Sequence, residues 1–273
     1  MMNFWEFIRE RIAIYHKKQD GQPRPWTEDR VLNKYYFCNI YREWDKTTIW
    51  FKDNLRDPLK DNESVIFATV IFRWFNRIET AVRMGPELFV DWDSKEAKKR
   101  LRGYSPVVTG AYIIKTPNDM NKLDGVCWCI DQMWKRKGYV IDLMRTQFGS
   151  LEMMHSSLLE FPYMGDFMAY EVVTDLRHTK IGEQARDVNT WGNPGPGCKR
   201  GLKYVFHESV FNKQERLRAM INLLQQSWDM PDIPKMELRD IESSLCEYSK
   251  YVAGHHSGKL KRLYRGSQSD GSK

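Results

Sequence analysis

The chain has 273 residues, 43 of them basic and 36 acidic, so its formal charge is +7 and its pI is near 9.0. A hydrophobic content of 41% with 29% charged residues excludes a disordered, collagen-like or coiled-coil chain. The longest apolar run, 65–72, is far shorter than the ~20 residues of a membrane helix, and the five cysteines lack CxxC spacing. We therefore expect a folded cytoplasmic protein with no membrane segment. Aromatic rings interleaved with a basic surplus can stack on bases while lysines and arginines meet phosphates, and the alternative is that most of these rings are core residues.

Capping signals and hydrophobic periodicity predict an all-α fold. Asn3 and Glu6 form a candidate capping box for a first helix at 4–18, and Thr27 is the expected cap of a second helical region that includes the aromatic-rich segment 36–55. Further helices are expected at 63–77, 94–102, 120–135, 151–161, 166–178, 212–228 and 236–252, with a loop or short strand pair at 103–117. We expect a single domain over 1–254, followed by a disordered basic tail at 255–273 that adds affinity for polyanions.

The segment 161–165 has the layout of a helix-hairpin-helix turn. Pro162 and Gly165 stand at that motif's proline and final glycine, while Tyr163 takes a position that is usually glycine. Such a turn directs backbone N–H groups of the following helix toward a DNA phosphate. An ordinary corner between two helices is the alternative.

Two acidic residues, Glu171 and Asp175, lie one turn apart on the helix predicted after this turn. Paired carboxylates can act as a base and its helper, or hold Mg²⁺ through their oxygens. The alternative is an exposed acidic face that pairs with Arg177 or Lys180. Asp187 follows twelve residues after Asp175.

A glycine-rich segment at 192–201 follows Asp187. Gly195 and Gly197 precede the cations Lys199 and Arg200, a pattern that predicts a loop whose backbone approaches a phosphate closely. It is not a Walker A loop, because the order differs and no Ser or Thr follows the lysine.

Several short motifs together resemble a known family. A hairpin followed by an aspartate about twenty residues later resembles the helix-hairpin-helix DNA glycosylases, and Gly165 and Asp187 have about that spacing. In more detail, the chain from about residue 3 to 251 resembles the α-glutamyl/putrescinyl thymine pyrophosphorylase family of phage DNA modification, and a related helical domain accompanies kinases that act on 5-hydroxymethyluracil in DNA. The motifs that carry this resemblance are at 25–27, 37–45, 109–112, 165–169, 175–176, 195–197, 200–202 and 240–247. Glu171 and Ser249 depart from the family pattern, which has glutamine and aspartate there.

The resemblance implies an amine transferase that acts on a base in duplex DNA. An amine from an amino acid or polyamine would replace the pyrophosphate on the 5-methylene group of a modified uracil, and the target base would be flipped into a pocket. The implied partners are modified double-stranded DNA, the amine donor and a 5-hydroxymethyluracil DNA kinase, in a phage-infected bacterial host. Mg²⁺ would help to neutralise the pyrophosphate, although no metal site can be named from the sequence.

The resemblance also implies roles for individual residues. Asp45, Asp175 or Asp187 would take the proton of the amine, and cations would meet the charge of the leaving group. The candidates near the leaving group are Arg42, Lys199 and Arg200; those around the base and the site are Asn39, Thr109, Tyr112, Glu171, Glu242, Glu247 and Lys250; those for DNA are Tyr163, Gly165, Gly195 and Gly197. For Tyr112 the alternative is core packing, and for Glu247 with Lys250 it is a surface ion pair of small energy.

Two other functions stay open at this point. One is a glycosylase that excises a modified base, with Asp187 supporting an oxocarbenium-like transition state; Phe167 stands where a Schiff-base lysine would be needed for the bifunctional type. The other is a non-catalytic DNA-binding partner of a base kinase. Fold alone does not decide between these reactions.

Overall fold

The computed structural model describes residues 1–207, 212–258, 260, 263 and 264. These residues are mostly helical, and the β-pairing among them is one isolated bridge between Tyr35 and Leu263, so the predicted all-α class is confirmed. Contacts divide the chain into two compact units, Met1–Asp45 with Pro194–Lys273 and Lys46–Asn193. The single domain over 1–254 stays an expectation.

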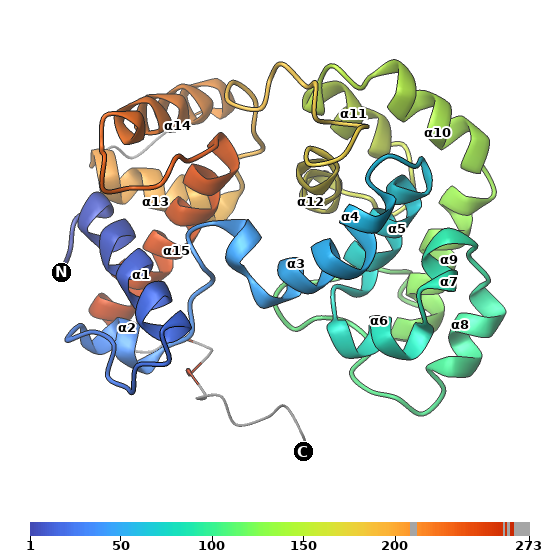
Figure 1. The fold of residues 1–273 in the computed structure, drawn as a ribbon, viewed down its shortest axis with the longest axis horizontal. Coiled ribbons are helices and arrows are strands. Elements are labelled where there is room, and N and C mark those ends of the chain that lie inside the picture. Colours follow the sequence, from blue (N-terminus) through green and yellow to red (C-terminus); the bar gives the residue numbers. More distant parts are fainter. Residues whose placement is uncertain (208–211, 259, 261–262, 265–273) are drawn as a thin grey trace. The chain divides into compact units, whose positions relative to one another are not determined.

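The first unit is built around one long C-terminal helix, α15 (Leu238–Ser257), which packs along α13 and also contacts α14, α1 and α2 (Figure 1). Its other elements are α1 (Phe4–Gln19), α2 (Arg30–Lys34), the 3-10 turn η1 (Arg42–Trp44), α13 (Pro196–Phe206) and α14 (Lys213–Trp228). The predicted capping boxes Asn3/Glu6 and Asn212/Glu215 are both present. They satisfy N–H groups that a helix start leaves open, which is why these two starts were predicted correctly.

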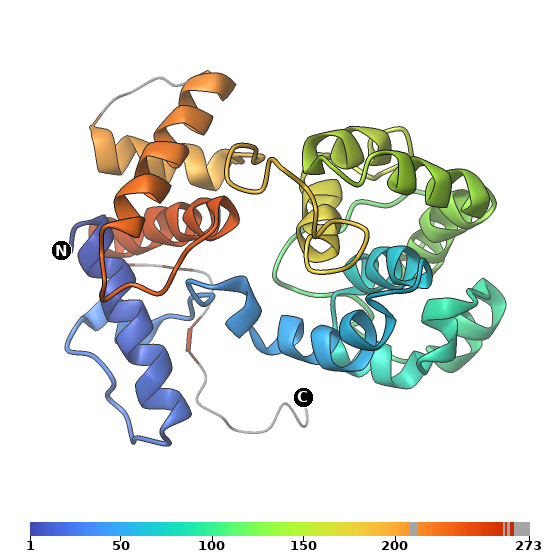
Figure 2. The ribbon, with the colours of Figure 1, turned by 45° about the horizontal axis from the view of Figure 1, so that its top comes forward.

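The second unit surrounds α5 (Ser64–Phe75), which packs against α12 and α7 and also contacts α9, α6 and η2 (Figure 2). Every residue of α5 from Val65 to Phe75 is buried, as the apolar run predicts for a core helix. The other elements are α3 (Lys46–Phe51), η2 (Lys52–Arg56), α4 (Asp57–Leu59), α6 (Ile78–Met84), α7 (Glu87–Val90), α8 (Ser94–Arg100), α9 (Lys122–Trp134), α10 (Lys137–Thr146), α11 (Leu151–Leu158) and α12 (Asp166–Leu176).

Two local predictions were wrong. Residues 36–41 are not helical, because side chains from other helices bind their backbone. Arg11 donates hydrogen bonds to the carbonyl groups of Phe37 and Cys38, and Glu247 accepts one from the N–H of Cys38. The glycine-rich segment is not a loop over its whole length either. Pro196 stands at the first helical position, where its fixed φ suits a helix start, and α13 begins there.

The C-terminal segment is ordered further than expected. Helix α15 continues to Ser257 and ends at Gly258, whose φ of 64° is the left-handed conformation typical of a helix end. Beyond it, the N–H of Tyr264 donates to the carbonyl of Lys34 at 3.0 Å. The predicted tail at 255–273 is therefore wrong for these residues; its remaining positions, 259, 261–262 and 265–273, lie outside the described residues.

Candidate functional site

The candidate residues fall into the two units. In the first unit lie Asn39, Arg42, Asp45, Gly195, Gly197, Lys199, Arg200, Glu242, Glu247 and Lys250; in the second lie Thr109, Tyr112, Tyr163, Gly165, Glu171, Asp175 and Asp187. Within each unit the hydrogen bonds show which residues meet.

In the first unit, Glu247 of α15 holds the non-helical segment 36–41. Its Oε2 atom accepts the N–H of Cys38 at 2.9 Å and the Nζ of Lys250 at 3.2 Å. The Glu247 side chain is only 12% exposed, and the Nζ of Lys250 lies 4.6 Å from the centre of the Phe37 ring. Glu247 and Lys250 therefore form a partly buried anchor for this segment and not an isolated surface pair.

Asp45 follows this segment after the turn η1 (Arg42–Trp44), and its side chain binds back to Asn39. Its Oδ1 atom accepts the N–H of Asn39 at 3.0 Å, while the side-chain amide of Asn39 donates to the carbonyl of Trp44 at 2.8 Å. Burial raises the pKa of Asp45 to about 6, against the opposing effects of the Asn39 N–H and of Arg42. In the described part of the chain no group donates to its Oδ2 atom. Asp45 is thus a carboxylate whose Oδ2 atom accepts no hydrogen bond from the described residues and whose pKa is about 6.

Arg11, which the sequence analysis did not single out, lies behind this segment. It is 7% exposed, and its Nη2 atom donates to the carbonyl groups of Phe37 at 3.3 Å and Cys38 at 3.1 Å. Burial lowers the pKa of Arg11, and Glu247 opposes this effect. The signal that would have found it is an arginine within the buried stripe of α1, between Ile8 and Ile12.

A second carboxylate, Asp240, binds the turn η1 and was also missed. It accepts the N–H of Glu237 at 2.9 Å and the backbone N–H of Arg42. Burial raises the pKa of Asp240 to about 7. Two residues further along α15, the buried Glu242 pairs with Arg239 at 2.7 Å. Arg42 is therefore placed by its backbone contact with α15.

The glycines of α13 serve close packing between helices. A Cβ atom at Gly197 would overlap the Sγ of Cys246, and one at Gly201 would overlap the carbonyl oxygen of Leu245. Their missing side chains let α13 approach α15. Helix packing therefore accounts for glycine at these two positions, and no bound phosphate is needed to explain them. Gly195 has open space around it, and the side chains of Lys199 and Arg200 are exposed.

In the second unit, Asp175 forms a buried ion pair with Arg73 of α5. The Nη2 of Arg73 donates to Oδ1 of Asp175 at 2.9 Å and its Nε to Oδ2, and the two side chains are 2% and 0% exposed. The hydroxyl of Tyr112 donates to the carbonyl of Arg73 at 3.0 Å. The exposed acidic face considered from the sequence is wrong, since Asp175 and Glu171 are both buried.

Asp187 caps the N-terminus of α11. Its Oδ1 atom accepts the N–H of Leu151 at 2.8 Å, and its Oδ2 atom accepts the hydroxyl of Ser150 at 2.8 Å and the N–H of Glu152 at 3.0 Å. These three donors use both oxygens of the carboxylate to hold the start of the helix. This geometry favours a structural role for Asp187.

The turn between α11 and α12 places Tyr163 in the left-handed conformation, with φ of 62°. Glycine adopts this conformation at no steric cost, so the tyrosine stands at a backbone position suited to glycine. Gly165 is the N-cap of α12 and offers no capping side chain. Tyr163 and Phe167 are about half exposed, and the centre of the Phe167 ring lies 4.8 Å from the centre of the Tyr112 ring. Thr109 lies in the adjoining loop, where its hydroxyl accepts the N–H of Ala111.

The described residues include neither a candidate metal cluster nor a membrane-spanning helix. No group of three or more His, Cys, Asp and Glu side chains is placed to hold a metal ion there, so Mg²⁺ stays an expectation. No helix among the same residues is long and apolar enough to cross a membrane.

Comparison with known proteins places the chain. A family model, the helical domain of 5-hmdU DNA kinase, matches residues 1–260. The chain belongs to this family. A 5-hmdU DNA kinase of Bacillus phage SP10 is 28% identical over 281 residues, an alignment that covers 92% of this chain and 44% of the phage protein. The chain thus spans less than half the length of this relative, and no solved structure matches it.

Proposed function

We propose that the chain is a transferase that replaces the pyrophosphate of 5-pyrophosphoryloxymethyluracil in DNA with an amine. The observation that carries this proposal is Asp45, a carboxylate with one oxygen open and a pKa raised to about 6 by burial. The family supports a DNA substrate, because the family model and the phage relative are both named for a kinase of 5-hmdU in DNA, the nucleoside from which the proposed substrate derives. The wider resemblance described above supports the exchange of pyrophosphate for an amine.

The reaction requires a base and a stabiliser of negative charge. The nitrogen of the amine attacks the 5-methylene carbon, the bond from that carbon to the pyrophosphate oxygen breaks, and the electron pair leaves with pyrophosphate. Asp45 takes the proton that the amine loses, a task for which a pKa near neutrality is suited. Three cations are candidates to stabilise the negative charge of the leaving pyrophosphate: Arg42, beside Asp45, and the exposed Lys199 and Arg200.

DNA would be held in part by the turn between α11 and α12. Its left-handed Tyr163 and the uncapped start of α12 at Gly165 are the features that a helix-hairpin-helix turn uses to receive a phosphate. Asp166 places an exposed carboxylate at the same helix start. If phosphate docks there, Asp166→Asn should tighten binding of duplex DNA in a salt-dependent manner, and unchanged affinity would contradict this role.

The test of Asp45 is product formation by Asp45→Asn. The substituted amide keeps an oxygen for the Asn39 N–H but cannot take a proton, so we expect loss of amine transfer with the fold and DNA binding retained. Asp53→Asn, an exposed aspartate of η2, is the matched control and should turn over normally. Normal turnover by Asp45→Asn would refute the assigned base.

A second function is favoured by the family match. The chain corresponds to the helical domain of a longer kinase, so a non-catalytic partner that presents DNA to a base kinase has direct support. This alternative predicts salt-dependent DNA binding, no product with any amine, and stimulation of a 5-hydroxymethyluracil DNA kinase when the chain is added.

A further inference from the structure

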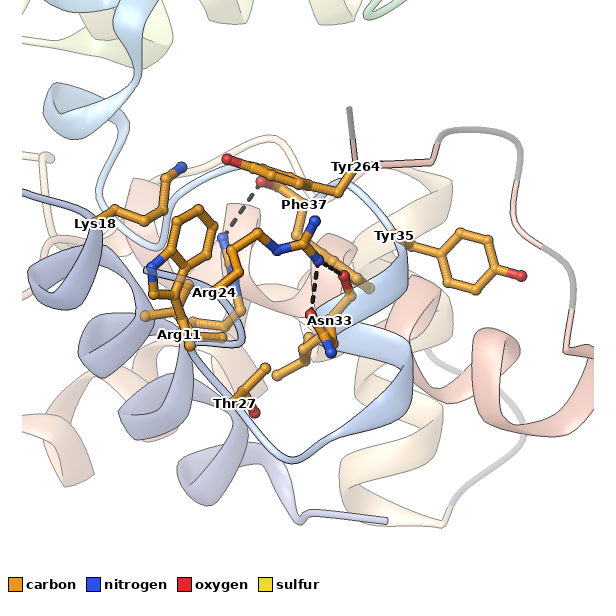
Figure 3. Close-up of a pocket in the computed structure, with 11 residues that line it drawn as sticks. Arg11, Lys18, Arg24, Thr27, Asn33, Tyr35, Phe37 and Tyr264 are labelled. Atoms are coloured by element: carbon orange, nitrogen blue, oxygen red, sulfur yellow. Dashed lines mark hydrogen bonds between the residues drawn. The ribbon is translucent and has the colours of Figure 1, made fainter. Parts of the chain in front are cut away.

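A hollow in the first unit lies outside the residues assigned above, apart from its contact with Arg11 (Figure 3). Its wall is formed by the C-terminal half of α1, the loop that carries Arg24 and Trp26, the start of the segment at Tyr35 and Phe37, and Tyr264 from beyond α15. The empty space is about 350 Å³ when its open mouth is included. The space that a water-sized sphere can occupy inside it is about 20 Å³, so a larger ligand would lie across the open mouth.

The charge of this hollow is one-sided. Arg11, Lys18 and Arg24 line it, and none of the described lining residues is Asp or Glu. In the described part of the chain neither Lys18 nor Arg24 forms an ion pair with a carboxylate. Burial, followed by the nearby charge of Arg11, lowers the pKa of Lys18. Asp45 opposes this effect on Lys18, but neither it nor Glu247 lines the hollow. Cations that face the same space are stabilised further when an anion binds there.

Arg11 supplies an independent sign of a missing ligand. Its Nη2 atom is used by the carbonyl groups of Phe37 and Cys38, but its buried Nε has no hydrogen-bond partner. A buried donor without a partner costs free energy, so the Arg11 guanidinium is incompletely satisfied beside the hollow.

The rest of the wall is aromatic. The ring of Tyr264 meets that of Trp26 edge-on at 5.5 Å, the Arg24 guanidinium lies 4.7 Å from the Tyr264 ring, and the Nζ of Lys18 lies within 5.5 Å of both rings (Figure 3). Arg24 is oriented by hydrogen bonds to Asn33. Cations that alternate with aromatic faces in this way fit a phosphate joined to a planar base, because the base stacks while the phosphate meets the charge.

We propose that this hollow binds the phosphate end of a nucleotide, with the phosphate on Arg11, Lys18 and Arg24 and the base against Tyr264 and Trp26. The site is separate from the assignment of Asp45 as a base and does not depend on the transferase reaction. The same chemistry is presented by a free nucleotide and by the 5′-phosphorylated end of a DNA strand.

The test is a set of titrations of the full chain with thymidine 5′-diphosphate, thymidine, inorganic pyrophosphate, and oligothymidylate with and without a 5′-phosphate. Thymidine 5′-diphosphate or the 5′-phosphorylated strand should bind, and Lys18→Gln or Arg24→Gln should weaken that binding about tenfold. Tighter binding of the diphosphate identifies a free nucleotide, and tighter binding of the phosphorylated strand identifies a DNA end. Arg30→Gln removes an exposed cation that does not line the hollow, and it should leave binding unchanged.

The contribution of the ring is tested separately. Tyr264→Leu should weaken binding of thymidine 5′-diphosphate several-fold and leave pyrophosphate binding unchanged, because pyrophosphate has no base to stack. The proposal fails if no phosphate ligand binds, if thymidine binds as tightly as its diphosphate, or if the Lys18 and Arg24 variants bind like Arg30→Gln. Circular dichroism of each variant is the control that its helices are intact.

Discussion

Replacement of Asp45 by asparagine should stabilise the protein at alkaline pH and have no such effect in acid. Burial raises the pKa of Asp45 from 3.8 to about 6. As the pH rises, the folded protein therefore keeps this proton to a higher pH than the unfolded chain does. The stability gained from this proton is fully present below about pH 4 and is lost as the pH rises through about 6. The difference between 3.8 and about 6, at about 1.4 kcal/mol for each pH unit, is about 3 kcal/mol. Since the side chain is partly accessible to water, we expect about 2 kcal/mol.

The assay is urea unfolding of the wild type and of Asp45→Asn at pH 4 and pH 8. The asparagine carbonyl can still accept the Asn39 N–H, so only the charge differs. The variant should be more stable by about 2 kcal/mol at pH 8 and about equal to the wild type at pH 4. Asp53→Asn is the control and should show no pH-dependent gap. A gap that fails to widen between the two pH values would refute the raised pKa and, with it, the reason for choosing Asp45 as the base.

Three further predictions test the placement of other candidate residues. Arg73→Met leaves the buried charge of Asp175 without its guanidinium and should cost about 3–5 kcal/mol of unfolding free energy in urea, whereas the double variant with Asp175→Leu should recover much of the loss. Gly201→Ala forces a Cβ into α15 and should cost about 1–3 kcal/mol, while Gly138→Ala, with open space around it in α10, should be neutral or stabilising; equal effects would show that α13 does not need its glycine. Asp187→Asn should lower stability by about 1 kcal/mol through the weakened cap of α11 and leave amine transfer intact, so loss of product in a folded Asp187→Asn protein would return Asp187 to the catalytic group.

Local signals in the sequence predicted local structure. The capping boxes at Asn3 and Asn212 and the apolar run of α5 depend on neighbouring residues, and all three are present. The segment 36–41 shows the limit of this approach. Its backbone is bound by Arg11 and by Glu247, which is 209 residues from Cys38, and no periodicity within the segment carries that information.

The candidate site was predictable to a similar extent. Asp45, Asn39 and Glu247 were selected through motifs, and the structure brings them to one segment of the first unit. The sequence could not distinguish Asp45 from Asp175 and Asp187, because that distinction depends on an arginine 102 residues away and on the start of a helix 36 residues away. Asp240 lies in the motif at 240–247, but the motif alone does not indicate its role. That role follows from its burial and from its contact with the backbone of Arg42.

The most direct test of the proposed transferase is to identify its product. The purified chain is incubated with duplex DNA that carries 5-pyrophosphoryloxymethyluracil and with a mixture of amino acids and polyamines, and the DNA is digested to nucleosides for mass spectrometry. We predict a nucleoside with an amine joined at the 5-methylene group, together with amine-dependent release of pyrophosphate. Unchanged nucleoside would contradict the transferase and favour the DNA-binding partner of a kinase, and free base with abasic DNA would contradict it in favour of a glycosylase.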